Sequence, residues 1–200
     1  MNLPCHDISK ACKGKLDKSD LQSYHRLMFY CLQCQTGQEA KVKKLLEIQM
    51  SFLSLGSVMF LYPQRQIMVR KQGKNAATLV DVLPGYIMCY CPDEIEFPAW
   101  DIKAVNGVFR ILKNPDGTYC LRNGDERFAI AVFHAGGVLK PVKVDYEEGG
   151  KVVIKEGVFK DLNARIVSVD KRKSRLTLEI VFDGNVTRLN LSMEAVLKTR

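Results

Sequence analysis

The sequence lacks the features that would place it in several large classes of protein. No run of apolar residues approaches the ~20 that a membrane-spanning helix needs, and the N-terminus has no apolar signal core. The seven cysteines are an odd number and do not have the density of a disulfide scaffold. We therefore expect a cytoplasmic protein with reduced thiols and without a membrane partner.

Catalytic and metal-binding patterns are also missing. No Ser/His/Asp set, phosphate-binding glycine loop or carboxylate pair stands out. Cys31 and Cys34 form a Cys-x-x-Cys pair, but no second Cys/His pair follows at metal-ligand spacing, and the strand-to-helix context of a thiol redox site is absent. Four further candidate ligands are irregularly spaced: Cys5, His6, Cys12 and His25. We expect no enzyme, no cofactor and no metal site, and a thiol enzyme built on Cys31 and Cys34 is the alternative.

Positive charge is present and unevenly distributed. The chain of 200 residues has a formal net charge of +8. Residues 151–200 hold 11 Lys/Arg against 6 Asp/Glu, whereas residues 51–150 hold 11 of each. Because phosphate contacts dominate nucleic-acid affinity, this asymmetry favours an RNA or DNA surface in the C-terminal part over an acidic protein partner. A solvated basic surface that aids solubility is the simpler alternative.

The N-terminal part reads as an α+β domain. Residues 1–26 are polar and Lys-rich, which predicts a poorly ordered extension. A strand over residues 28–32 leads to Thr36 and Glu39, which are spaced as a capping box for an amphipathic helix. Further strands are expected at residues 58–62, 66–71, 78–83, 86–90 and 108–112, and helices at residues 94–105 and 125–134. We predict a mainly antiparallel sheet flanked by helices over residues 27–134.

The C-terminal part reads as a small all-β barrel. Residues 135–147 contain Gly136-Gly137, Pro141 and acidic residues, and are expected to be a linker. In residues 148–200, β-branched and aliphatic residues alternate with polar ones along short runs that are separated by glycine turns. A barrel closes its own sheet edges and can be stable on a small core. Its outer face is then available for binding.

Five short motifs in a fixed order resemble the NusG family of transcription elongation factors. They are Phe29-Tyr30, then Gly37 with Glu39, then residues 83–87 (Leu-Pro-Gly-Tyr-Ile), followed by the two halves of a KOW pattern, residues 150–154 (Gly-Lys-Val-Val-Ile) and 156–159 (Glu-Gly-Val-Phe). The resemblance covers residues 28–198. It implies a NusG N-terminal domain, an SH3-like KOW barrel and no catalysis.

Three positions depart from the family pattern. Phe29 replaces a usual Trp, Leu83 a usual Phe, and Ala164 a glycine that is common late in the KOW motif. With the N-terminal extension and the basic barrel, these departures resemble specialised antitermination paralogs of the RfaH or LoaP type more than the general factor.

The resemblance implies that the N-terminal domain docks on the clamp helices of RNA polymerase and so suppresses pausing or termination. We expect the protein to be a monomer. An apolar patch suits a helical partner. The residues carried over to this role are Phe29, Tyr30, Val82, Leu83, Pro84, Tyr86 and Ile111.

Two basic sets are candidate nucleic-acid contacts. The first, on the barrel, is expected to bind RNA, such as a nascent hairpin: Lys160, Arg165, Lys171, Arg172, Lys173, Arg175 and Arg188. The second, around the hairpin at Gly73, is a candidate DNA contact: Arg65, Arg70, Lys71 and Lys74. Two alternatives stay open. A general factor of this family recruits Rho or ribosomal protein S10 through the segment around Phe159 and Leu162, and a ribosome-associated RNA-binding protein also uses KOW barrels.

Overall fold

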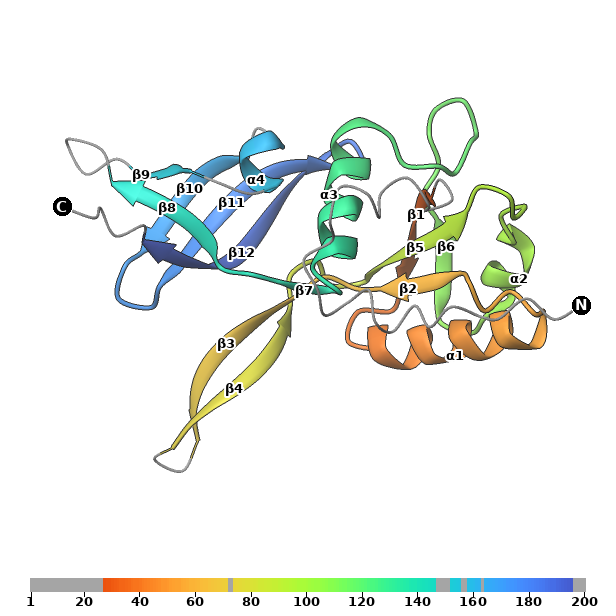
Figure 1. Cartoon of the computed structure of the whole chain (residues 1–200), viewed down its shortest axis with the longest axis horizontal. Coiled ribbons are helices and arrows are strands. Elements are labelled where there is room, and N and C mark those ends of the chain that lie inside the picture. The colour runs from red at the N-terminus through yellow and green to blue at the C-terminus, as the bar shows by residue number, and fades with distance from the viewer. Residues whose placement is uncertain (1–26, 72–73, 147–151, 156–157, 163, 196–200) are drawn as a thin grey trace, which may run out of the picture.

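The computed structural model describes residues 27–71, 74–146, 152–155, 158–162 and 164–195 (Figure 1). The expected N-terminal extension, with its cysteines and histidines, lies outside these residues, as do parts of both KOW motifs. The strands are β1 (Leu27–Cys34), β2 (Met59–Leu61), β3 (Gln64–Lys71), β4 (Lys74–Asp81), β5 (Tyr86–Pro92), β6 (Val108–Ile111), β7 (Val138–Leu139), β8 (Val142–Tyr146), β9 (Val152–Ile154), β10 (Arg165–Asp170), β11 (Arg175–Phe182) and β12 (Asn185–Ala195). The helices are α1 (Glu39–Phe52), α2 (Ala99–Ala104), α3 (Asn123–His134) and α4 (Val158–Asp161).

The N-terminal part is built on an antiparallel sheet with the strand order β2-β5-β1-β6. Successive side chains of a strand point to opposite faces of the sheet. The two central strands, β5 and β1, therefore contribute side chains to two separate cores. Tyr30 and Cys89 pair across the strands on one face, which is covered by α1 and α2. Phe29 and Tyr90 pair on the opposite face, which packs against α3. The expected α+β fold is therefore present.

Two helix starts differ from the sequence expectation. No side-chain cap closes the start of α1; instead the buried Glu39 carboxylate accepts a hydrogen bond from the Gly85 N–H at 2.7 Å. The helix expected from residue 94 begins only at Ala99, after Pro98. The residue before a proline is disfavoured in α geometry, which excludes Phe97 from the helix.

Strands β3 and β4 form a hairpin arm that projects away from the rest of the chain (Figure 1). Near its base, β3 also pairs in parallel with β7. The sheet of the arm has the order β4-β3-β7 and is separate from the sheet that contains β1.

The C-terminal part is a nearly closed sheet with the strand order β10-β11-β12-β8-β9, as expected for an SH3-like barrel. The predicted alternation is confirmed along β11, where Leu176, Leu178, Ile180 and Phe182 are buried. Two strands, β7 and β8, lie within the segment that was expected to be a linker. Val142 and Val144 are buried in β8, which pairs with β12 and β9, so this segment contributes a strand to the barrel.

One hydrophobic core runs through both halves of the chain. It contains Met88 and Tyr90 of β5, Phe128 of α3, and Phe182 and Leu189 of the barrel. In Figure 1, α3 stands between the N-terminal sheet and the barrel. The barrel is thus packed against the N-terminal domain instead of hanging from it.

Candidate functional site

The turn between β11 and β12 reaches across to the N-terminal sheet. Phe182, at the end of β11, meets Tyr86 of β5 edge to face, with ring centroids 5.7 Å apart and an interplanar angle of 85°. It also contacts Phe128 of α3 at 5.6 Å and 70°. Edge-to-face rings at these distances add stabilisation beyond the area that they bury. We call the contact of Tyr86 and Phe128 with Phe182 the aromatic seam.

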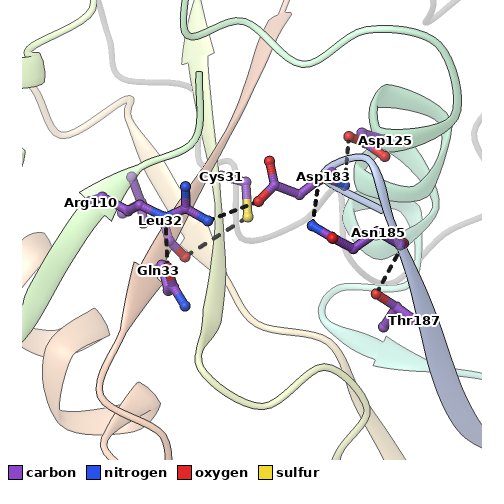
Figure 2. Close-up of polar contacts among 8 residues, drawn as sticks. All are labelled: Cys31, Leu32, Gln33, Arg110, Asp125, Asp183, Asn185 and Thr187. Atoms are coloured by element: carbon purple, nitrogen blue, oxygen red, sulfur yellow. Dashed lines mark hydrogen bonds and ion pairs between the residues drawn. The ribbon is translucent and has the colours of Figure 1, made fainter. Parts of the chain in front are cut away.

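Polar contacts also join the turn between β11 and β12 to the N-terminal part (Figure 2). The Arg110 guanidinium donates hydrogen bonds to Gln33 Oε1 at 2.7 Å and to Asp183 Oδ2 at 2.9 Å, which links β6 and β1 to the barrel. The Asp183 backbone N–H donates to Asp125 Oδ2 of α3 at 3.1 Å. Burial raises the pKa of the Asp125 carboxyl, and this N–H opposes the rise by favouring the charged form.

The seven residues expected to dock a partner do not share one surface. Phe29 and Tyr86 lie on the α3 face and are half-buried, and Pro84 is exposed. Tyr30 and Ile111 are buried in the core on the opposite face of the sheet. Val82 and Leu83 are each 5% exposed in the core on the α3 face. The docking role of this set remains a prediction, and four of its members are core residues in the present arrangement.

Cys31 and Cys34 are separated by the sheet. Cys31 belongs to the core on the α3 face and Cys34 to the core on the α1 face. Burial raises the pKa of the Cys31 thiol strongly, and it raises that of Cys34 to about 11. A thiolate is needed for redox or metal chemistry, so neither cysteine is suited to it. Within the described residues, no group of three or more metal-ligating side chains occurs, and no helix is long and apolar enough to cross a membrane.

The basic residues of the barrel are mostly at its surface. Six of the seven are exposed, and Arg175 is half-buried: Lys160, Arg165, Lys171, Arg172, Lys173, Arg175 and Arg188. Arg188 is paired with Glu179, with its Nε 3.0 Å from the Glu179 Oε1. The turn over residues 171–174 between β10 and β11 gathers Lys171, Arg172 and Lys173, and we call it the basic turn.

The second basic set lies on the hairpin arm. Arg70, Lys71 and Lys74 are at the far ends of β3 and β4, and their side chains lie outside what the structure describes. Arg65 differs from the expectation of an exposed contact because it is only 6% exposed, at the base of the arm. The neighbouring Gln66 carbonyl accepts a hydrogen bond from Ser192 Oγ of the barrel at 3.0 Å, so the two basic sets approach each other.

Sequence reasoning missed the residues that join the two halves. Arg110 and Asp183 are 73 positions apart, and no local pattern in one sequence reveals such a pair. Phe182 follows the alternation of the barrel core, so the sequence identifies it only as an interior residue of the barrel. Its contact with Tyr86 could not be predicted from that pattern. The Asp183-Gly184-Asn185 turn signal was visible, although it does not say what the turn touches.

The comparisons with known proteins agree on one family. The family model for the transcription termination factor NusG matches residues 27–126. The NusG transcription termination/antitermination proteins of Pasteurella multocida and Staphylococcus aureus are each 24% identical to the chain, over 184 and 174 residues. These alignments cover 86% and 85% of the chain and 94% of each relative.

A solved structure has the same fold. One solved structure describes a domain interaction in Thermotoga maritima NusG. The alignment with it covers 84% of this chain and 94% of that chain. Its TM-score is 0.52 and its sequence identity is 20%. From the family model, the relatives and the fold together, the chain belongs to the NusG family of transcription termination/antitermination factors, which are not enzymes.

Proposed function

We propose that this chain is a transcription elongation and antitermination factor that docks on the clamp helices of RNA polymerase and suppresses pausing or termination. The docking surface that we propose is the α3 face of the N-terminal sheet around Tyr86. As a factor of transcription, it would act in the cytoplasm. The specialised character suggested by the sequence departures is part of the same proposal.

The observation that carries this proposal is the way in which Tyr86 is covered. Its ring is packed by Phe182, which belongs to the barrel and not to the N-terminal domain. Removal of the barrel would therefore expose the Tyr86 ring near the exposed Pro84, on the sheet face that carries Phe29 four pairing positions further along. An aromatic and aliphatic patch of this kind is typical of a surface that accepts a helix.

Docking on this face requires that the contact with the barrel opens. The Arg110 and Asp183 side chains of the ion pair are 55% and 19% exposed, and exposed ion pairs contribute only about 0–1 kcal/mol. The aromatic seam supplies the larger part of the stabilisation through burial. We propose that polymerase competes with Phe182 for Tyr86, so that docking displaces the barrel.

This proposal changes the roles of four expected docking residues. Tyr30 stacks on Phe97 with ring centroids 3.7 Å apart, and Ile111 is buried on the same side of the sheet. Together with Val82 and Leu83, they support the docking face from within. Phe29, Pro84 and Tyr86 are left as the residues that would touch the partner.

The barrel would contribute the second contact, and we propose that this is RNA bound through the basic turn. Recruitment of Rho or ribosomal protein S10 is the alternative. Phe159 is buried and lies 6.5 Å from Phe128, measured between ring centroids, so the segment expected to bind these proteins faces α3 in the present arrangement. The basic turn, in contrast, is exposed to solvent in the present arrangement of the two halves.

Two substitutions at the aromatic seam test the proposal because they have opposite expected effects. Phe182→Ala removes the cover and should increase the capture of RNA polymerase severalfold in a pull-down with the full chain. Tyr86→Ala removes a docking residue as well as the seam contact, and should decrease it. Circular dichroism checks that both variants are folded. Equal effects of the two variants, or capture of ribosomes without polymerase, would contradict the proposal.

A further inference from the structure

Arg65 is a buried cation, and two of its three guanidinium nitrogens have no hydrogen-bond partner among the described residues. The residue is 6% exposed, and the two nitrogens, Nε and Nη1, are buried. A buried guanidinium is ordinarily paired with a carboxylate, because an uncompensated charge inside a protein is strongly unfavourable. The burial and charge of Arg65 therefore suit it to bind an anionic group.

The charged group that acts on the pKa of Arg65 is a second arginine, Arg175. Burial lowers the pKa of Arg65, and the positive charge of Arg175 lowers it further. Arg175 is paired across the strands with Ser192, and Ser192 Oγ donates to the carbonyl next to Arg65. Arg65 and Arg175, which come from opposite halves of the chain, therefore lie near one another at the junction of the hairpin arm with the barrel.

The basic turn continues this junction. Lys171, Arg172 and Lys173 are exposed and directly precede Ser174 and Arg175. The carboxylate of the turn, Asp170, is already engaged, because its Oδ1 accepts from the Lys173 backbone N–H at 3.0 Å and its Oδ2 lies 3.7 Å from Lys173 Nζ. The barrel surface beside this junction is therefore cationic.

We propose that Arg65 and Arg175 form one phosphate-binding site shared by the two halves of the chain, and that an RNA strand bound along the basic turn places a phosphate there. Guanidinium groups suit this ligand because their planar N–H donors match phosphate oxygens. The site deepens the RNA contact proposed above and rests on it.

The test uses the full chain and a fluorescein-labelled RNA hairpin, with binding measured by anisotropy over a range of salt concentrations. Arg65→Gln and Arg175→Gln should each weaken binding by about tenfold and reduce the salt slope by about 0.7. The double variant should lose less than the product of the single losses, because both arginines hold one phosphate. Arg122→Gln removes an exposed arginine that is paired with Asp116, and it should bind as the parent chain does.

Two further measurements separate the possible failures. Arg65→Lys keeps the charge but not the Nε–H, so weakened binding in this folded variant would support the proposal even if Arg65→Gln did not fold. Inorganic phosphate should raise the thermal midpoint of the parent chain and not that of Arg65→Gln. Phosphate could raise the midpoint of the parent chain alone while the parent chain and Arg65→Gln have the same salt slope for RNA binding. In that case the site binds free phosphate and the RNA assignment is wrong.

The outcomes also distinguish this inference from the function on which it rests. If neutralising Lys171, Arg172 and Lys173 weakens RNA binding but Arg65→Gln does not, the barrel binds RNA alone and the shared site is refuted. If neither change matters, the RNA contact itself fails.

Discussion

At the scale of single residues, burial decides the chemistry of the thiols. Cys34 has a pKa of about 11, raised mainly by burial and further by the nearby Glu39 and Asp81 carboxylates. In the unfolded chain its pKa returns to near 9.0. The folded state therefore binds more protons between these two values, and the free energy of unfolding falls as the pH rises through this range.

This gives a pH prediction. The stability of the parent chain in urea should decline between about pH 9 and pH 11, and Cys34→Ala should have a shallower decline. Cys91→Ala should behave similarly, since its thiol pKa is also about 11 through burial. Parallel curves for parent and variants would show that these thiols are not protected in the folded chain.

The cysteines also show what could be predicted from sequence at this scale. The sequence argues against a metal site because no second ligand pair accompanies Cys31 and Cys34, and this expectation stays a prediction. The role of Glu39 could not be obtained in this way. Its spacing from Thr36 predicts a local cap, whereas the carboxylate bonds to Gly85, 46 positions away, because the turn before β5 lies against the start of α1.

At the scale of elements, the turn between β4 and β5 is fixed by Gly85. Its φ of +83° is in the left-handed region, and an added Cβ would lie 3.0 Å from Thr36 Oγ1 and 3.3 Å from the Cys34 carbonyl oxygen. Gly117 has a φ of +84° but nothing within 4 Å of the Cβ position. The two glycines share a backbone conformation and differ in their surroundings.

Substitution of each glycine by alanine separates the cost of the left-handed backbone conformation from the cost of steric contact with the added Cβ. Gly117→Ala should lower the free energy of unfolding by about 1–2 kcal/mol, from the left-handed conformation alone. Gly85→Ala should lower it by more, since Thr36 and the Cys34 carbonyl must also move. Denaturant titration of both variants measures the difference, and equal losses would mean that the turn before β5 relaxes freely.

Strands and helices were the most predictable elements. Period-two alternation identified the buried residues of β11, because a half-buried strand imposes that pattern on its sequence. Strand β8 was missed, since Pro141 and the preceding glycines resemble a linker and only the pairing of Val142 and Val144 with β12 and β9 makes a strand of it. Partners distant in sequence leave no local signal.

At the scale of the whole molecule, the shared core couples the two halves. Phe182 is 2% exposed and lies between Tyr86 and Phe128. A buried aromatic contact of this size makes the stability of each half depend on the other. The expectation from sequence was two independent domains with a linker, and the reason for the difference is that an apolar residue of the barrel core also fits a neighbouring surface.

Calorimetry of the full chain tests this coupling. The parent chain should unfold in a single transition, and Phe182→Ala, at a loss of about 3–5 kcal/mol, should divide it into two. Phe60→Ala is the matched control, because Phe60 is equally buried but belongs to the core under α1. It should lower the midpoint without dividing the transition. A single transition in Phe182→Ala would show that the seam is not what joins the halves.

The short connection between β7 and β8 would limit how far the barrel moves in the displacement that we propose. Only Lys140 and Pro141 separate a strand that is fastened to the arm from a strand that is fastened to the barrel. Two extended residues provide a leash of roughly 10 Å. A displaced barrel would therefore pivot beside the arm, and RNA bound to it would stay close to any partner of the N-terminal sheet.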